Sequence, residues 1–163
     1  MEYYQFATFW RINSPLPAVW DLIYHSEHWP EWWRGLESVV ELDKGDENGL
    51  GNLRRYTWKG ALPYRLTFDI RTTRIQLQVL IEGVSSGDLD GTGIWRFSRE
   101  GDLTVVRYDW RVQTAKRWMN ALVPVARPLF RWNHDKIMEW GRKGLVKRLG
   151  NGVQCMASAS IKT

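Results

Sequence analysis

The segment between residues 36 and 114 alternates apolar and polar residues, and this pattern restricts the fold more than any other feature of the sequence. In the stretch YRLTFDIRTTR, every second position is apolar, from Tyr64 to Ile70. Successive side chains of a β-strand point to opposite faces, so such a stretch has one apolar and one polar face. VVEL, GNLRRYTWKG, IQLQVLIEG and a hairpin turning at REGD extend the pattern. We therefore expect about six antiparallel strands, covered on one face only.

The segments on either side of this region predict a further strand and the helices that cover the apolar face of the sheet. YYQFATFWRI alternates and predicts a first strand, SPLPAVWDLIYH predicts a short helix capped by Ser14, and SEHWPEWWRG predicts a second short helix or turn. Pro124 and Pro128 are expected to kink or break the following helical segment, leaving a leading turn or helix and then a long helix from about Arg127 to Leu149. The predicted fold class is α+β.

The chain length of 163 residues predicts a single domain, residues 1–149, followed by a disordered tail, residues 150–163. One cysteine, Cys155, permits no disulfide within the chain. The N-terminus lacks the pattern of a signal peptide, and no window approaches 18 uninterrupted apolar residues. We expect a soluble, cytoplasmic protein, either a monomer or a homodimer.

Positive charge is concentrated near the C-terminus. Residues 116–149 contain nine lysines and arginines against Asp135 and Glu139, a balance of +7 within a net charge of +5. Such a helix can meet nucleic acid, anionic lipid or an acidic partner, or can simply be solvated. Binding of nucleic acid is disfavoured because the tryptophans of the predicted strands lie on the apolar face, where a covering helix would bury them. The sequence contains no phosphate loop and no recognisable metal motif, so we expect no metal or cofactor.

His134 lies within the apolar stripe of the predicted long helix. At about 100° per residue, its side of the helix also holds Phe130, Ile137, Met138 and Leu145. Asp135, Glu139 and Lys143 fall on the opposite side. An inward histidine is either a satisfied core residue or a general acid or base at a ligand site.

The apolar phase of the strands carries aromatic side chains with polar tips. These are Tyr56, Trp58, Tyr64, Trp95, Tyr108 and Trp110. Buried Tyr and Trp need hydrogen-bond partners, which a ligand cavity would supply, although a plain aromatic core is the alternative. HWPEWWRG adds three tryptophans in a connector, which form either ordinary packing or a semi-mobile gate over an opening.

Taken in chain order, these motifs resemble the Bet v 1-like superfamily, also called START-like or SRPBCC, and within it the polyketide cyclase/dehydrase group. The resemblance covers residues 3–149. Its marks are SPLPAVWDLI, HWPEWWRG, KGALPYRLTF, GDLDGTGIWRF, TVVRYDWRV and RPLFRWNHDKIMEWGRKGLVKRL. It implies a helix-grip fold, in which a curved seven-stranded antiparallel sheet surrounds a long C-terminal helix, with two short helices after strand 1 and a deep apolar cavity.

The resemblance also implies a binder of polyketides, lipids, sterols, quinones or aromatic metabolites, with cyclase or dehydratase activity possible. It transfers no shared catalytic motif. The expected ligand-binding residues are Arg54, Tyr56, Trp58, Tyr64, Leu66, Phe68, Trp95, Tyr108, Trp110, Phe130, His134 and Met138. His134 is the candidate catalytic residue. Two alternatives stay open: a lipid or quinone chaperone that docks on anionic membrane through its basic helix, and an interaction module with a filled core.

Overall fold

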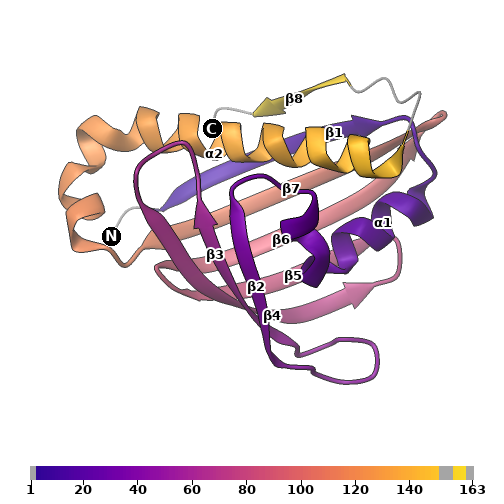
Figure 1. Ribbon diagram of the computed structural model, residues 1–163, viewed down its shortest axis with the longest axis horizontal. Coiled ribbons are helices and arrows are strands. Elements are labelled where there is room, and N and C mark those ends of the chain that lie inside the picture. Colours follow the sequence, from indigo (N-terminus) through magenta and orange to yellow (C-terminus); the bar gives the residue numbers. More distant parts are fainter. Residues whose placement is uncertain (1–2, 151–155, 161–163) are drawn as a thin grey trace.

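The computed structural model describes residues 3–150 and 156–160 (Figure 1). Its elements are β1 (Tyr4–Ile12), α1 (Leu16–Tyr24), the 3-10 helix η1 (Ser26–Glu31), β2 (Leu36–Asp43), β3 (Leu53–Lys59), β4 (Arg65–Gln76), β5 (Leu80–Gly87), β6 (Leu89–Glu100), β7 (Leu103–Thr114), α2 (Arg117–Leu149) and β8 (Met156–Ser160). The predicted order of one strand, two short helices, six strands and one long helix is confirmed.

All strands belong to one antiparallel sheet in the order β2-β3-β4-β5-β6-β7-β1-β8. The sheet curves around α2, and α1 and η1 lie near the C-terminal end of that helix (Figure 1). The polar face carries ion pairs between neighbouring strands. Arg55 lies 2.7 Å from Asp69, and Arg96 lies 2.7 Å from Asp109. The alternation in the sequence therefore separates a charged outer face from an aromatic inner face.

The stretch IQLQVLIEG was expected to be one strand, and that prediction is wrong. Residues 77–79 form the turn between β4 and β5, where Gln76 pairs with Leu80 and Gln78 has a positive φ of 57°. The turn has no glycine, proline or asparagine, so it lacks the residue types that usually indicate a turn in a sequence. The turn lies at these residues because of the register in which β4 pairs with β5, and the local sequence does not reveal that register.

Helix α2 runs from Arg117 to Leu149 without interruption. Figure 1 shows its first turns at an angle to the rest, so the expected kink is present but the expected break is not. Pro124 and Pro128 each lack an amide hydrogen, which removes a helical bond and bends the axis. A second expectation also fails: the residue before α1 is Pro15, and no side chain caps that helix. Instead, the carbonyl oxygen of Ser14 accepts a hydrogen bond from Thr104 Oγ1 at 2.6 Å.

The C-terminal segment differs in part from the predicted tail. Residues 156–160 form β8, an antiparallel strand on the free edge of β1. The prediction of disorder is therefore wrong for these five residues, and for 151–155 and 161–163 it lies outside the described residues. Strand β8 is the eighth strand, added to the seven that the resemblance implied. It covers an edge whose backbone groups would otherwise be open to pairing.

The connector after α1 packs directly on α2 at two glycines. The indole Nε1 of Trp33 donates to the carbonyl oxygen of Ile137 at 2.8 Å. A Cβ on Gly141 would overlap the Trp33 ring, and a Cβ on Gly144 would overlap the carbonyl oxygen of Trp32. Because only glycine permits this approach, the two positions fix where the connector meets the helix.

Candidate ligand-binding cavity

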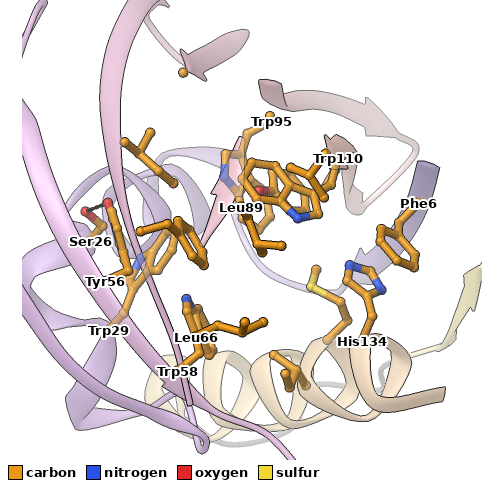
Figure 2. A pocket seen from close by; sticks show the side chains of 18 of the residues that line it. Phe6, Ser26, Trp29, Tyr56, Trp58, Leu66, Leu89, Trp95, Trp110 and His134 are labelled. Atoms are coloured by element: carbon orange, nitrogen blue, oxygen red, sulfur yellow. Dashed lines mark hydrogen bonds between the residues drawn. The ribbon is translucent and has the colours of Figure 1, made fainter. Parts of the chain in front are cut away.

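A cavity of about 180 Å³ lies between the inner face of the sheet, α2 and the α1–η1 segment. Side chains from β1, η1, β3 to β7 and α2 line it, and Figure 2 shows a selection of them. The structure brings all of the expected residues to this one cavity. They are Arg54, Tyr56, Trp58, Tyr64, Leu66, Phe68, Trp95, Tyr108, Trp110, Phe130, His134 and Met138. The alternative of a completely filled core is therefore wrong.

Stacked aromatic rings form the wall that the sheet contributes. The rings of Trp95 and Tyr108 are nearly parallel, with centroids 4.0 Å apart, and Tyr108 continues to Trp110 at 5.8 Å. Gly93 makes this arrangement possible, because a Cβ there would meet both the Trp110 ring and the Tyr108 hydroxyl. The wall is built of stacked aromatic rings, and such a surface suits a planar ligand.

A cluster of polar side chains marks one end of the cavity. Ser26 Oγ accepts a hydrogen bond from Arg54 Nη1 at 2.8 Å and lies 2.7 Å from the Tyr56 hydroxyl. Arg54 also pairs with Glu27 at 3.0 Å and with Glu41 at 3.2 Å. One hydroxyl hydrogen joins Ser26 to Tyr56, and the hydrogen of the other hydroxyl is left over. The cluster therefore has a hydrogen-bond donor that it can direct at a ligand.

Burial keeps the cavity tyrosines protonated. It raises the pKa of Tyr56, an effect that the hydrogen bond with Ser26 and the charge of Arg54 oppose. Burial raises the pKa of Tyr108 well above its ordinary value, and it raises that of Tyr64 to about 12. For Glu27, burial works toward a higher pKa, but its backbone hydrogen bond and Arg54 together lower it. The tyrosines are thus neutral donors, and Arg54 faces an ionised partner.

His134 marks the opposite end of the cavity, where Figure 2 shows it facing Phe6. The two rings stack at 3.9 Å and 14°. Among the described residues, neither ring nitrogen has a hydrogen-bond partner, although Asp135 Oδ1 is 3.5 Å from Nδ1. Burial lowers the pKa of His134, while Asp135 opposes and Arg131 adds to the decrease. A neutral imidazole with unused nitrogens therefore borders the cavity.

The three tryptophans of HWPEWWRG are all buried. Trp29 Nε1 donates to the carbonyl oxygens of Leu22 and Ile23, at 3.0 and 3.2 Å. Trp29 and Trp33 line the cavity, and Trp32 packs beside them. Their burial and these contacts favour ordinary packing over a gate.

Sequence reasoning missed several lining residues that come from the first third of the chain. They are Tyr4, Phe6, Ile23, Ser26, Trp29 and Trp33. The alternation of apolar residues in the first strand could have identified Tyr4 and Phe6, because both lie on its apolar side. Nothing in the local sequence indicated that Ser26 meets β3, because its partners lie 28 and 30 residues away.

Within residues 3–150 and 156–160, no three histidines, cysteines or acidic residues cluster as metal ligands would. Over the same residues, no helix combines the length and apolarity needed to cross a membrane.

Comparison with protein families decides the relationship of this chain. Residues 12–139 match the model of the family described as polyketide cyclase/dehydrase and lipid transport. The chain belongs to this family. The match confirms that the sequence motifs were correctly identified as resembling the polyketide cyclase/dehydrase group. No curated protein sequence matches it significantly.

Solved structures agree with the family assignment at the level of fold. The protein TTHA0849 from Thermus thermophilus is 18% identical, with a TM-score of 0.75, and the match covers 90% of this chain and 97% of that one. A START superfamily protein from Mycobacterium smegmatis is 13% identical, with a TM-score of 0.71 and coverage of 90% and 97%. The Zhui aromatase/cyclase from Streptomyces sp. R1128 is 13% identical, with a TM-score of 0.70 and coverage of 91% and 94%. The fold is the helix-grip fold, in which an antiparallel sheet curves around a long C-terminal helix.

Proposed function

We propose that this protein binds a compact aromatic metabolite with a polar group at each end. The observation that carries the proposal is the shape of the cavity, whose aromatic walls separate the Ser26–Tyr56 pair from His134 (Figure 2). A planar ring would stack between the walls. A carbonyl or hydroxyl at one end would accept the spare hydrogen of the Ser26–Tyr56 pair, and a hydroxyl at the other end would donate to His134.

The volume of the cavity supports a small ligand. At about 180 Å³, it exceeds only slightly the cavity of about 150 Å³ that is known to hold benzene. Pockets for drug-sized molecules measure roughly 300–1,000 Å³. A long polyketide chain, a sterol or a lipid would need the cavity to widen or would have to extend outside it. Among the ligand classes that the sequence suggests, aromatic metabolites fit best.

His134 is the residue that we propose for acid–base chemistry, if the bound molecule reacts. A neutral imidazole can remove a proton from the ligand and return it to a leaving hydroxyl, which is the proton transfer that cyclisation with dehydration requires. Such help contributes roughly 10²–10⁴-fold in rate. At the other end, the hydrogen bond from the Ser26–Tyr56 pair would stabilise negative charge on an oxygen, because Arg54 polarises that pair.

The first test is native mass spectrometry of freshly purified protein, followed by identification of any small molecule that denaturation releases. Calorimetry then compares 4-hydroxyacetophenone, an aromatic probe with two polar ends, with decanoate. We expect the aromatic probe to bind more tightly. Tyr56→Phe and His134→Phe should each weaken its binding about tenfold, the loss of one buried hydrogen bond. Tyr3→Phe, a change at an exposed tyrosine, should not. Tighter binding of decanoate would contradict the proposal.

A carrier without catalysis is the second candidate. Burial in an apolar cavity stabilises a ligand by about 0.8 kcal/mol per CH₂ group, so carriage needs no reactive residue. Incubation of the identified ligand with the protein separates the two candidates. Product formation that His134→Phe abolishes indicates an enzyme. Recovery of unchanged ligand indicates a carrier, for which a membrane would be a natural source of cargo.

A further inference from the structure

The first half of α2 is apolar on two sides. Met119 and Phe130 point inward, are buried and line the cavity. A second set of large apolar side chains lies on the outside and is exposed: Trp118, Leu122, Val125, Leu129 and Trp132. We name this set the outer stripe. A helix that is apolar on both sides is normally covered on both.

The spacing of the outer stripe makes it a continuous surface. Its residues follow one another at intervals of four, three, four and three, so they stay within one narrow sector of the helix. Measured along the helix axis, which bends within this segment, the stripe extends about 21 Å from Trp118 to Trp132 at 1.5 Å per residue. Val125 at its centre is 85% exposed and Leu122 is 51% exposed. No other part of the described chain presents such a row of exposed apolar residues on a helix.

The charge of this part of α2 indicates what covers the stripe. Residues 116–134 contain no acidic residue and four cationic ones: Arg117, Arg131, Lys116, which pairs with Asp88 at 3.2 Å, and Arg127, which donates to the carbonyl oxygen of Tyr3. Lys136 follows on the same sector as the stripe, with its ammonium 6.0 Å from the Trp132 ring. A second copy of this chain would bring like charges together. An anionic lipid surface accepts both the apolar side chains and the cations, and tryptophan is enriched at membrane interfaces.

We propose that the outer stripe docks this protein on anionic lipid bilayers, with α2 lying in the interface. This inference goes beyond the ligand-binding function and does not depend on it. The stripe is also close to the cavity. The Trp118 ring packs edge-on against Tyr64, at 5.4 Å, and near Phe130, at 6.4 Å, and both of these residues line the cavity. One layer of side chains therefore separates the docking surface from the ligand site.

Vesicle flotation tests the proposal, with vesicles of phosphatidylcholine alone or mixed two to one with phosphatidylglycerol. The variant pair is Leu122→Ser with Val125→Ser. The matched control is Leu77→Ser with Val79→Ser, because these two residues, in the turn between β4 and β5, are also more than half exposed, at 73% and 52%. We expect the wild-type protein and the control to bind the anionic vesicles. The stripe variant should bind at least tenfold less, and high salt should weaken the binding that remains.

Three outcomes of the flotation would overturn the proposal: equal binding by the stripe variant and the control, no binding by the wild type, or binding that is independent of phosphatidylglycerol. Sedimentation of the same proteins identifies the other possible occupant. If the wild type is a dimer and the stripe variant a monomer, the stripe joins two copies instead. Calorimetry with the small-molecule probe serves as the folding control. A stripe variant that still binds the probe but not the vesicles locates the defect at the surface.

Discussion

At the scale of single residues, His134 combines a structural cost with a chemical opportunity. Its ring is buried against Phe6, and its two nitrogens lack hydrogen-bond partners among the described residues. A buried polar atom without a partner destabilises a fold by about 1–3 kcal/mol. Phenylalanine would keep the ring stack and remove that cost. Residues that lower stability in this way are concentrated at functional sites.

We predict that stability depends on pH through His134. Burial lowers its pKa, so between that lowered value and the ordinary value of 6.5 the unfolded chain binds more protons than the folded one. The free energy of unfolding should therefore fall as the pH drops below 6.5, by at most about 1.4 kcal/mol per pH unit. Urea titrations of the wild type and of His134→Phe at several pH values measure this effect. Parallel curves for the two proteins would contradict it.

We also predict that Ser26→Ala destabilises the protein by about 1–3 kcal/mol, since Arg54 and Tyr56 would each lose a buried partner. Urea unfolding measures the change. Ser98→Ala, on the exposed face of β6, is the control and should change stability by less than about 0.5 kcal/mol. Equal destabilisation by the two variants would mean that the Ser26 hydroxyl contributes no more to stability than the hydroxyl of an exposed serine.

The sequence predicted some of these residues and could not predict others, for a physical reason. Helical periodicity alone places His134 beside Phe130 and Met138, and the structure confirms that it faces inward. The partnership of Ser26 with Arg54 depends on how η1 meets β3 in space. Local periodicity contains no information about such contacts.

At the scale of elements, the contact between α2 and the segment that follows η1 depends on two glycines. Gly144→Ala should raise the helix propensity of α2 by up to about 1 kcal/mol, yet we predict a net destabilisation of about 2 kcal/mol. The added methyl group would push against the carbonyl oxygen of Trp32, which cannot move without shifting the connector. Urea unfolding measures this, with Lys147→Ala on the exposed side of α2 as the control. A higher stability of Gly144→Ala would contradict this prediction and would mean that the connector shifts to make room for the methyl group.

Predictions from sequence were accurate for strands and helices but not for how they end. Apart from IQLQVLIEG, the alternating runs and the hairpin at REGD are confirmed. Ser14 does not cap α1, and the prolines bend α2 without breaking it, because helix ends and bends depend on tertiary packing as well as on local preference. The turn at residues 77–79 has no turn residue at all, so only the register of β4 and β5 reveals it.

At the scale of the whole molecule, the sheet and α2 share one core. Trp10, Val106 and Trp110 of the sheet and Met138 of α2 belong to the same buried cluster. We therefore predict a single cooperative unfolding transition, in which tryptophan fluorescence and far-UV circular dichroism give the same midpoint. A ligand at one hundred times its dissociation constant should stabilise the fold by about 2.7 kcal/mol. Separate midpoints for the two signals would mean that α2 or the sheet unfolds independently.

The fold class and the first seven strands followed from the alternation in the sequence, whereas β8 was not predicted. The cavity was expected, but its volume was not predictable. A cavity is the small difference between the space that the elements enclose and the volume of the side chains that fill it. Sub-ångström changes in the curvature of the sheet alter that difference, and no pattern of residues records them.

The position of α2 after the seven main strands has a consequence for synthesis of the chain. A ribosome makes the sheet first, so its inner face, with Trp58, Trp95 and Trp110, has no cover until residues 117–149 emerge. At about 5–20 residues per second, that interval lasts on the order of a few seconds. During it, the nascent chain presents a broad aromatic surface to the cell. We therefore expect newly made chains to engage chaperones until α2 closes over the sheet.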